Sequence, residues 1–162
     1  MRSLKNILLV LASVSFVLVI GAGLYEHVAA VPRWSAAPPA SLTMFQGKYG
    51  LNPALFWMSI HPVTLLLLMA ALISNWKTER KKQLLWALGG YVIILILTAT
   101  WFVPNLVQII NIPYHDDVNE ALRSKAALWE KLSIVRLFIM VVLSFILLSS
   151  LIKPVEKTSL DR

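Results

Sequence analysis

The chain has 162 residues, of which 58% are hydrophobic and 14% are charged, and its mean hydropathy is +0.73. These values exclude a soluble globular domain and predict an all-α integral membrane protein, because apolar runs of about 20 residues form membrane-spanning helices. The absence of cysteine excludes disulfides, thiolate catalysis and iron–sulfur ligation. We expect one membrane domain over residues 1–152 and a short cytoplasmic tail over 153–162.

Four apolar runs predict a four-helix bundle, with spans near residues 4–24, 53–75, 84–103 and 132–152. The formal net charge of +7 is divided unevenly between the two ends of these spans. The end with both termini and the turn at 76–82 carries nine basic and three acidic residues, whereas the other end carries five of each. The positive-inside rule therefore predicts cytoplasmic termini and a multi-pass protein of the cell (inner) membrane. This rule explains the excess of basic residues, so we expect no nucleic-acid partner.

The first span admits two interpretations. A basic lead, an apolar run over 7–20 and the tripeptide Val28-Ala29-Ala30 resemble a cleavable signal peptide. We expect a retained span, because the apolar run is long for a signal sequence and continues through residues 21–24. The connection at 25–50 is rich in proline and glycine and forms the long external loop. It either lies at the membrane interface or forms a lid over an outward-facing cavity.

The second span contains the first functional candidate, His61. Asn52 and Pro53 predict the start of its helix, which runs to about Asn75. Pro62 lies inside that helix, where its missing N–H is expected to bend the rod beside His61. An ionisable side chain within a span faces the protein interior and is a candidate for a functional site.

The third and fourth spans are separated by a turn outside the membrane. Pro104 is expected to kink or end the third span after Val103. Asp117 and Glu120 have the spacing of a capping box, which predicts one long helix from about 118 to 152. The first turns of this helix are expected to lie outside the membrane or at its surface.

Helix rise places three side chains at one depth. At about 1.5 Å per residue from the cytoplasmic ends, His61, Arg136 and Trp101 all lie roughly 21–25 Å up, in the outer third of the membrane core. Glu26 lies slightly above them. We expect an outward-opening polar pocket bounded by these side chains and by Asn105. The alternative is a structural Glu26–Arg136 ion pair, with His61 hydrogen-bonded to a carbonyl group.

A metal or haem site is a further alternative. Candidate ligands near the outer end are His27, His61, His115 and Asp116. We expect no cofactor, because the sequence has no H-x-x-x-H or E-x-x-H pair and only one histidine is securely inside the membrane. His115 followed by two aspartates is more typical of a solvated turn.

The chain resembles the four-span anthrone oxygenase-like membrane proteins, most bacterial members of which have no assigned activity. The resemblance covers the four spans, the long first external loop, the short basic turn and the final helix that begins outside the membrane. Its local features are Pro32 with Trp34, Val103-Pro104-Asn105, and Trp129 followed seven residues later by Arg136. Many members have a histidine four residues after that tryptophan, where this chain has Ser133.

The resemblance implies oxygenation of a lipophilic phenolic, anthrone-type carbon without a bound metal or flavin. A base removes the acidic C–H, a cation stabilises the enolate oxygen, and dioxygen attacks the carbanion. In this chain we expect His61 as the base and Arg136 as the oxyanion stabiliser, with Glu26 orienting either one. The expected substrate-binding residues are Trp57, Trp101, Asn105 and Trp34.

A second class of function is non-enzymatic. The chain is then a binder of hydrophobic small molecules, or an accessory subunit whose outer polar cluster docks a partner. A cavity lined by aromatic side chains and convergent polar groups favours an enzyme, whereas a bundle filled by side chains favours the accessory role. Both classes have the lipid bilayer as a partner and allow an oligomer.

Overall fold

Every regular element in the described part of the chain is a helix. The computed structural model describes residues 2–154. In chain order the elements are α1 (Arg2–Tyr25), the π-helix η1 (Glu26–Ala30), α2 (Val31–Ser35), the 3-10 helix η2 (Ala40–Phe45), α3 (Ala54–Ser74), α4 (Lys81–Leu97), the π-helix η3 (Thr98–Phe102), α5 (Val103–Ile110) and α6 (Glu120–Ser149). The predicted all-α class is confirmed.

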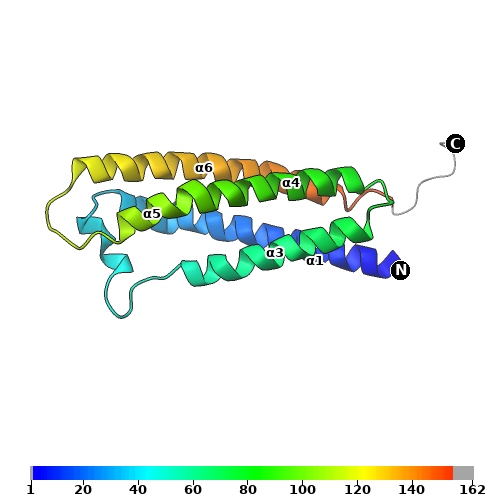
Figure 1. The fold of residues 1–162 in the computed structure, drawn as a ribbon, viewed down its shortest axis with the longest axis horizontal. Helices are drawn as coiled ribbons and strands as arrows, with labels where there is room; N and C mark the ends of the chain where they lie inside the picture. The colour runs from blue at the N-terminus through cyan, green and yellow to red at the C-terminus, as the bar shows by residue number, and fades with distance from the viewer. Residues whose placement is uncertain (1, 155–162) are drawn as a thin grey trace.

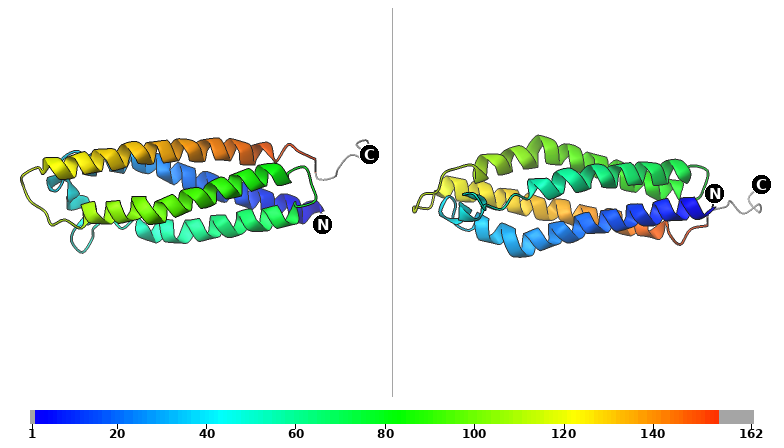
Figure 2. Two further views of the ribbon diagram at one scale, coloured as in Figure 1. Left: turned by 45° about the horizontal axis from the view of Figure 1, so that its top comes forward. Right: turned by 90° about the horizontal axis from the view of Figure 1, so that it is seen from below.

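These elements form four rods, each long and apolar enough to cross a membrane: Leu4–Ser35, Ala54–Ser74, Lys81–Ile110 and Glu120–Ser149. The rods lie side by side as an elongated bundle (Figures 1 and 2). Helix α1 packs against α3 and α6, and α4 packs against the same two helices. Helices α3 and α6 therefore occupy diagonal corners, so that their inward-facing side chains meet across the interior.

Large apolar side chains cover the outside of the rods. Leu66, Ile93 and Phe138 lie on three different helices and are 61%, 60% and 68% exposed. Continuous apolar surface of this kind is covered by lipid tails in a bilayer. The interior between the rods is filled by a separate cluster that includes Phe16 and Tyr91. The protein is thus apolar both inside and outside, as expected of a multi-pass membrane protein.

Two rods are longer than the sequence predicts. A loop is expected from residue 25 onward, yet helix continues through η1 and α2 to Ser35. Pro104 is expected to kink or end the third span, yet helix continues through η3 and α5 to Ile110. The reason is shared: Pro32 and Pro104 each lie in the first turn of an α-helix that follows a π-helical turn, where the fixed φ of proline suits the helix.

Asparagines lie at the starts of the second and fourth rods. Helix α3 begins one residue later than predicted, with Pro53 instead of Asn52 at the N-cap, although the Asn52 Oδ1 atom accepts a hydrogen bond from the Ala54 N–H at 3.2 Å. Asn119 is the N-cap of α6, and its Oδ1 atom accepts from the Leu122 N–H at 3.0 Å. The capping box predicted at Asp117 and Glu120 is therefore wrong, because the helix begins one residue after Asn119.

Helices α4 and α6 approach each other closely at Gly90. A Cβ atom at that position would lie 2.7 Å from both methyl groups of Leu143, whereas a Cβ at Gly89 would meet nothing within 4 Å. Of the two adjacent glycines, only Gly90 is required by packing.

The start of α1, the turn between α3 and α4, and the end of α6 lie together at one end of the bundle, called the basic end below (Figure 1). Buried polar side chains join these segments. Arg80 is 5% exposed and donates hydrogen bonds to Asn6 Oδ1 at 2.7 Å and to the Lys153 carbonyl at 3.0 Å. Asn75 is fully buried, and its Nδ2 atom lies 3.4 Å from the Lys5 carbonyl.

A second apolar cluster closes the opposite end, called the loop end. Its buried members are Val31, Trp34, Leu42, Phe102, Ile109, Leu122, Ala126 and Trp129. The external connection therefore folds back over the bundle, where several hydrogen bonds hold it, among them Ser35 Oγ to Glu130 at 2.7 Å. Gln46 Nε2 donates to the Ile112 carbonyl at 3.2 Å, and the Asn119 N–H donates to the Pro38 carbonyl at 3.0 Å.

Candidate functional site

Two π-helical turns interrupt the first and third rods. In η1 the Val31 N–H bonds to the Glu26 carbonyl, and in η3 the Val103 N–H bonds to the Thr98 carbonyl, five residues back in each case. A proline follows each valine, so the next N–H of the ladder is missing. Single π-helical turns within α-helical rods are frequent at functional sites. Here both turns contribute side chains that interact with the same arginine, Arg136.

Arg136 extends from α6 toward the third rod. Its Nη1 atom donates to Thr98 Oγ1 at 3.1 Å, and its Nη2 atom donates to Ser133 Oγ at 2.8 Å. The guanidinium carbon lies 4.1 Å from the centre of the Phe102 ring, which is a cation–π contact. These groups solvate the arginine within an apolar span, where an unaccompanied charge would be costly. They do not neutralise its charge.

Glu26 supplies a nearby negative group. Its Oε1 atom accepts a hydrogen bond from Trp57 Nε1 at 2.9 Å, which links η1 to α3. The carboxylate interacts electrostatically with Arg136. Among the ion pairs of residues 4–154, however, none joins the two groups within 4 Å. The direct Glu26–Arg136 pair considered from the sequence is therefore not formed.

His61 faces a tyrosine and a tryptophan rather than a carbonyl group. Its Nδ1 atom lies 2.7 Å from the Tyr91 hydroxyl on α4. Its ring is stacked on Trp57, with ring centres 5.2 Å apart and an angle of 21° between the planes. The positive charge of Arg136 acts on it across the bundle. Its Nε2 atom has no hydrogen-bond partner among the described residues, yet is not sealed from the surface.

Hydroxyl groups continue this network toward the basic end. Tyr91 is also hydrogen-bonded to Thr64. Thr64 Oγ1 lies 2.6 Å from Ser15 Oγ and donates to the Ile60 carbonyl at 2.9 Å. Thr64 is fully buried, as is the Tyr91 side chain. The interior therefore contains a connected series of polar side chains from three rods.

Sequence reasoning missed four of these partners: Tyr91, Thr64, Thr98 and Ser133. A signal existed for Tyr91. Counted by helix rise from the ends of α3 and α4, His61 and Tyr91 lie roughly 20 Å and 15 Å from the basic end, within reach of a tyrosine side chain. The small hydroxyl residues gave no comparable signal, because serine and threonine are common in membrane spans and bond to their own backbone.

The predicted substrate-binding residues divide into two groups. Trp57 is half-buried and touches both Glu26 and His61. Trp34 is 2% exposed, and its ring packs edge-on against Trp129 at 5.4 Å between centres. It therefore fills the loop-end cluster and presents no free face.

The other two predicted binding residues lie on the third rod. Trp101 is half-buried against the loop-end cluster and makes an edge contact with Phe102 at 4.7 Å between ring centres. Asn105 Nδ2 donates to the Trp101 carbonyl at 2.8 Å, one helical turn back. The asparagine is thus occupied by its own helix, while Trp101 stays beside the aromatic ring that supports Arg136.

The candidate metal ligands are scattered. His27 Nδ1 lies 2.7 Å from the Gly23 carbonyl, which can only accept, so this nitrogen carries the proton. Its Nε2 atom is buried without a partner. His61 is committed to Tyr91 through Nδ1. Within residues 2–154, no three histidine, aspartate or glutamate side chains come together in an arrangement that could hold a metal ion.

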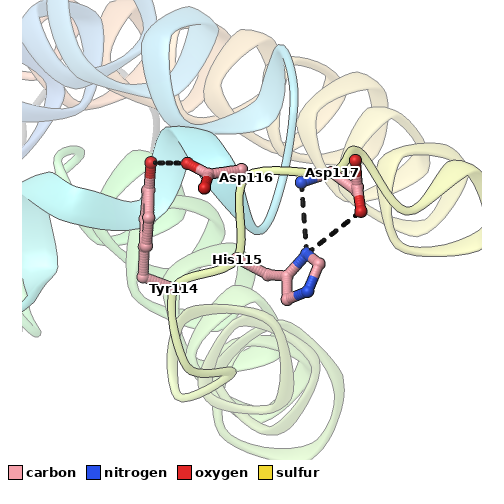
Figure 3. A network of polar contacts seen from close by, with 4 residues as sticks. All are labelled: Tyr114, His115, Asp116 and Asp117. Atoms are coloured by element: carbon pink, nitrogen blue, oxygen red, sulfur yellow. Dashed lines mark hydrogen bonds and ion pairs between the residues drawn. The ribbon is translucent and has the colours of Figure 1, made fainter.

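His115 and Asp116 lie in an exposed turn at the loop end (Figure 3). His115 Nδ1 accepts a hydrogen bond from the Asp117 N–H at 3.1 Å and lies 3.6 Å from the Asp117 carboxylate. Tyr114 donates to Asp116, and this hydrogen bond raises the pKa of the tyrosine. The contacts are local to four consecutive residues, as expected of a solvated turn.

Two pockets open on the molecule away from Arg136 and His61. One is an apolar groove of about 280 Å³ between α1 and the end of α6, lined by residues such as Val14 and Leu148. The other, of about 690 Å³, lies at the basic end. The group formed by Glu26, Trp57, His61, Tyr91, Thr98, Ser133 and Arg136 is called the polar cluster below, and none of its members lines either of these two pockets.

Comparison of the chain with protein-family models, with curated proteins and with solved structures finds no match.

Proposed function

We propose that the chain is a multi-pass protein of the cell membrane with its basic end in the cytoplasm. The support is the turn between α3 and α4, which contains or adjoins Lys77, Arg80, Lys81 and Lys82 and lies at the end of the bundle opposite the loop end (Figure 1). Cytoplasmic loops retain an excess of lysine and arginine during insertion. The polar cluster then lies in the outer half of the membrane.

We propose further that the polar cluster is the active site of a cofactor-independent oxygenase that acts on a lipophilic phenolic compound of the anthrone type. One observation carries this proposal: Trp57 stacks on His61 and donates a hydrogen bond to Glu26, so that a histidine and a carboxylate adjoin the same indole within apolar spans that also hold Arg136. Ionisable groups in a membrane interior are expensive and typically functional. A base and a cation in one apolar site can generate and stabilise an enolate.

In this proposal the basic nitrogen of His61 is Nε2. Its Nδ1 atom is engaged with the Tyr91 hydroxyl at 2.7 Å, and when Nδ1 donates the proton of that hydrogen bond, Nε2 carries a lone pair. That lone pair is then available to remove a proton from a substrate.

Arg136 would stabilise the oxygen of the enolate. Its two hydroxyl partners are neutral, so the guanidinium retains charge for an anionic ligand. Dioxygen, which partitions into lipid, combines with the carbanion, and the resulting hydroperoxide loses water to leave a new carbonyl group. The methylene carbon loses two hydrogens, one oxygen atom enters the product and the other leaves as water.

The test is dioxygen-dependent conversion of an anthrone-type compound by the purified protein in nanodiscs. We expect turnover with incorporation of labelled dioxygen into the product carbonyl, and its loss in His61→Gln. His115→Gln is the matched control, because its ring lies in the exposed turn. Full turnover by His61→Gln would remove His61 from the role of base, and no turnover by the native protein would remove the substrate class.

A different observation favours a second function, that of a non-enzymatic accessory subunit. The loop end is closed by buried Trp34 and Trp129, and the two open pockets lie elsewhere. In this case the polar cluster specifies helix packing, and native copies should co-purify with a membrane partner. Inactivity toward anthrones together with such a stable complex would favour this function.

A further inference from the structure

The pocket of about 690 Å³ at the basic end is lined mainly by positively charged side chains. It lies in the turn between α3 and α4 and beside the end of α6. Its charged lining residues are Lys77, Lys81, Lys82, Lys153 and Glu79. Four positive groups against one negative group leave an excess of three positive charges. Trp76 and Thr78 complete the lining.

Buried hydrogen bonds fix the backbone from which these lysines project. Thr78 is 5% exposed; its Oγ1 atom donates to the Asn75 carbonyl at 2.8 Å and accepts from the Arg80 N–H at 3.2 Å. The Arg80 side chain donates to the Lys153 carbonyl at 3.0 Å, which attaches the end of α6 to the turn. The pocket is therefore built on an ordered scaffold and is not a chance grouping of surface lysines.

Tryptophans mark the pocket as interfacial. Trp76 is 49% exposed, and Lys81 Nζ lies 3.7 Å from the centre of its ring. Trp86, which lies five residues after Lys81 in α4, is 68% exposed. Exposed tryptophans on membrane spans lie at the level of the lipid headgroups. The lysines around Trp76 thus face the layer in which phospholipid phosphates lie.

We propose that this pocket binds the headgroup of an anionic phospholipid from the cytoplasmic leaflet. The lysine ammonium groups would contact the phosphate, and Trp76 would lie against the glycerol region. Basic pockets between membrane helices on the cytoplasmic side have the chemistry that recognises such headgroups. A soluble phosphate would gain the same charge contacts but nothing from the exposed tryptophan. The inference rests on the proposed membrane orientation and is independent of the chemistry assigned to His61 and Arg136.

The test measures lipid binding to the full-length protein. Native mass spectrometry and thermal unfolding would follow titration of the detergent-solubilised protein with phosphatidylglycerol or with phosphatidylcholine. We expect phosphatidylglycerol, but not phosphatidylcholine, to bind and to raise the unfolding temperature. The variant Lys77→Gln/Lys82→Gln should bind it roughly 30-fold more weakly, because each lysine near a headgroup contributes about a fivefold factor. Both lysines are exposed, so the fold should be retained.

The matched control is Lys5→Gln/Lys131→Gln, which removes the same charge outside the pocket. An equal loss of affinity in this control would overturn the proposal in favour of general attraction to positive surface. Equal stabilisation by inorganic phosphate would also overturn it, since a lipid would not be required. Another variant of the same pocket, Lys81→Gln/Lys153→Gln, should weaken phosphatidylglycerol binding to a similar extent. Unchanged binding in this variant and in Lys77→Gln/Lys82→Gln would contradict the assignment.

Discussion

The Nδ1 atom of His61 and the hydroxyl of Tyr91 lie 2.7 Å apart, joining the second and third rods inside the bundle. Both residues are surrounded by apolar side chains, and the Tyr91 ring also packs on Phe16 with ring centres 5.2 Å apart. The hydrogen bond fixes the direction of the imidazole. Tyr91 is accordingly a positioning residue for His61.

Replacement of Tyr91 by phenylalanine tests this role. The ring still fills its site, so we expect a loss of about 1 kcal/mol of stability from the missing hydrogen bond. Turnover of an anthrone-type substrate should fall roughly 10- to 100-fold, the range found for groups that orient a functional histidine. The fall should appear in kcat with little change in KM. Tyr25→Phe is the control, because Tyr25 is 71% exposed.

Two replacements of Arg136 separate charge from packing. Arg136→Met removes the charge and the donors to Thr98 and Ser133, and it should lower kcat by about 10²–10³, as for loss of an oxyanion donor. Arg136→Lys keeps a cation and should retain more activity. Both proteins should insert and fold, which circular dichroism and yield would verify. Unchanged kcat with reduced yield would assign Arg136 a structural role.

Trp34 and Trp57 should behave differently when truncated. Trp34 is 2% exposed in the loop-end cluster, so Trp34→Ala should destabilise the protein by roughly 3–5 kcal/mol. Trp57→Phe keeps an aromatic ring and loses only the hydrogen bond to Glu26, which should cost about 1 kcal/mol and raise the KM for substrate. Thermal unfolding in detergent and steady-state kinetics measure the two effects. A mild effect of Trp34→Ala would mean that the loop-end cluster is not tightly packed.

Adjacent glycines provide a paired test of helix packing. Gly90→Ala places a methyl group against Leu143 and should destabilise the protein by about 1 kcal/mol, the low end for overpacking, because only the ends of the leucine must move. Gly89→Ala meets nothing and should stabilise by up to about 1 kcal/mol through helix propensity. Chemical or thermal unfolding compares them. Equal effects would show that α4 and α6 do not meet at Gly90.

The membrane orientation is tested with reporter fusions. Alkaline phosphatase inserted at Gly47, in the external connection, should be active, whereas the same enzyme fused to the C-terminus should be inactive because it remains in the cytoplasm. A fluorescent protein fused to the C-terminus should be fluorescent, because such a protein folds in the cytoplasm. Replacing Lys77, Lys81 and Lys82 by glutamine should mix the two orientations. A C-terminal phosphatase that is active in the native background would reverse the proposed topology.

Part of the polar cluster could be predicted from local rules. His61 and Arg136 are ionisable groups in apolar spans, and helix rise predicts a similar depth for them. Their partners depended on which helices are neighbours. Because α3 and α6 are diagonal, His61 bonds to Tyr91 on adjacent α4, and Arg136 bonds to Thr98 on the third rod. Helix adjacency is not encoded in the spacing of residues along one span.

By itself, the sequence determined the helical class, the number of spans and the concentration of basic residues at one end, because hydropathy and charge act residue by residue in a bilayer. It also identified Pro104 as a position where the third span changes. Only the tertiary structure decided that Pro32 and Pro104 follow π-helical turns and leave the rods continuous, and that Trp34 fills a core instead of lining a pocket. A proline ends a helix or begins its next turn according to two conditions: which neighbouring groups satisfy the freed carbonyls, and how much apolar surface the longer helix buries. Both conditions are properties of the assembled bundle.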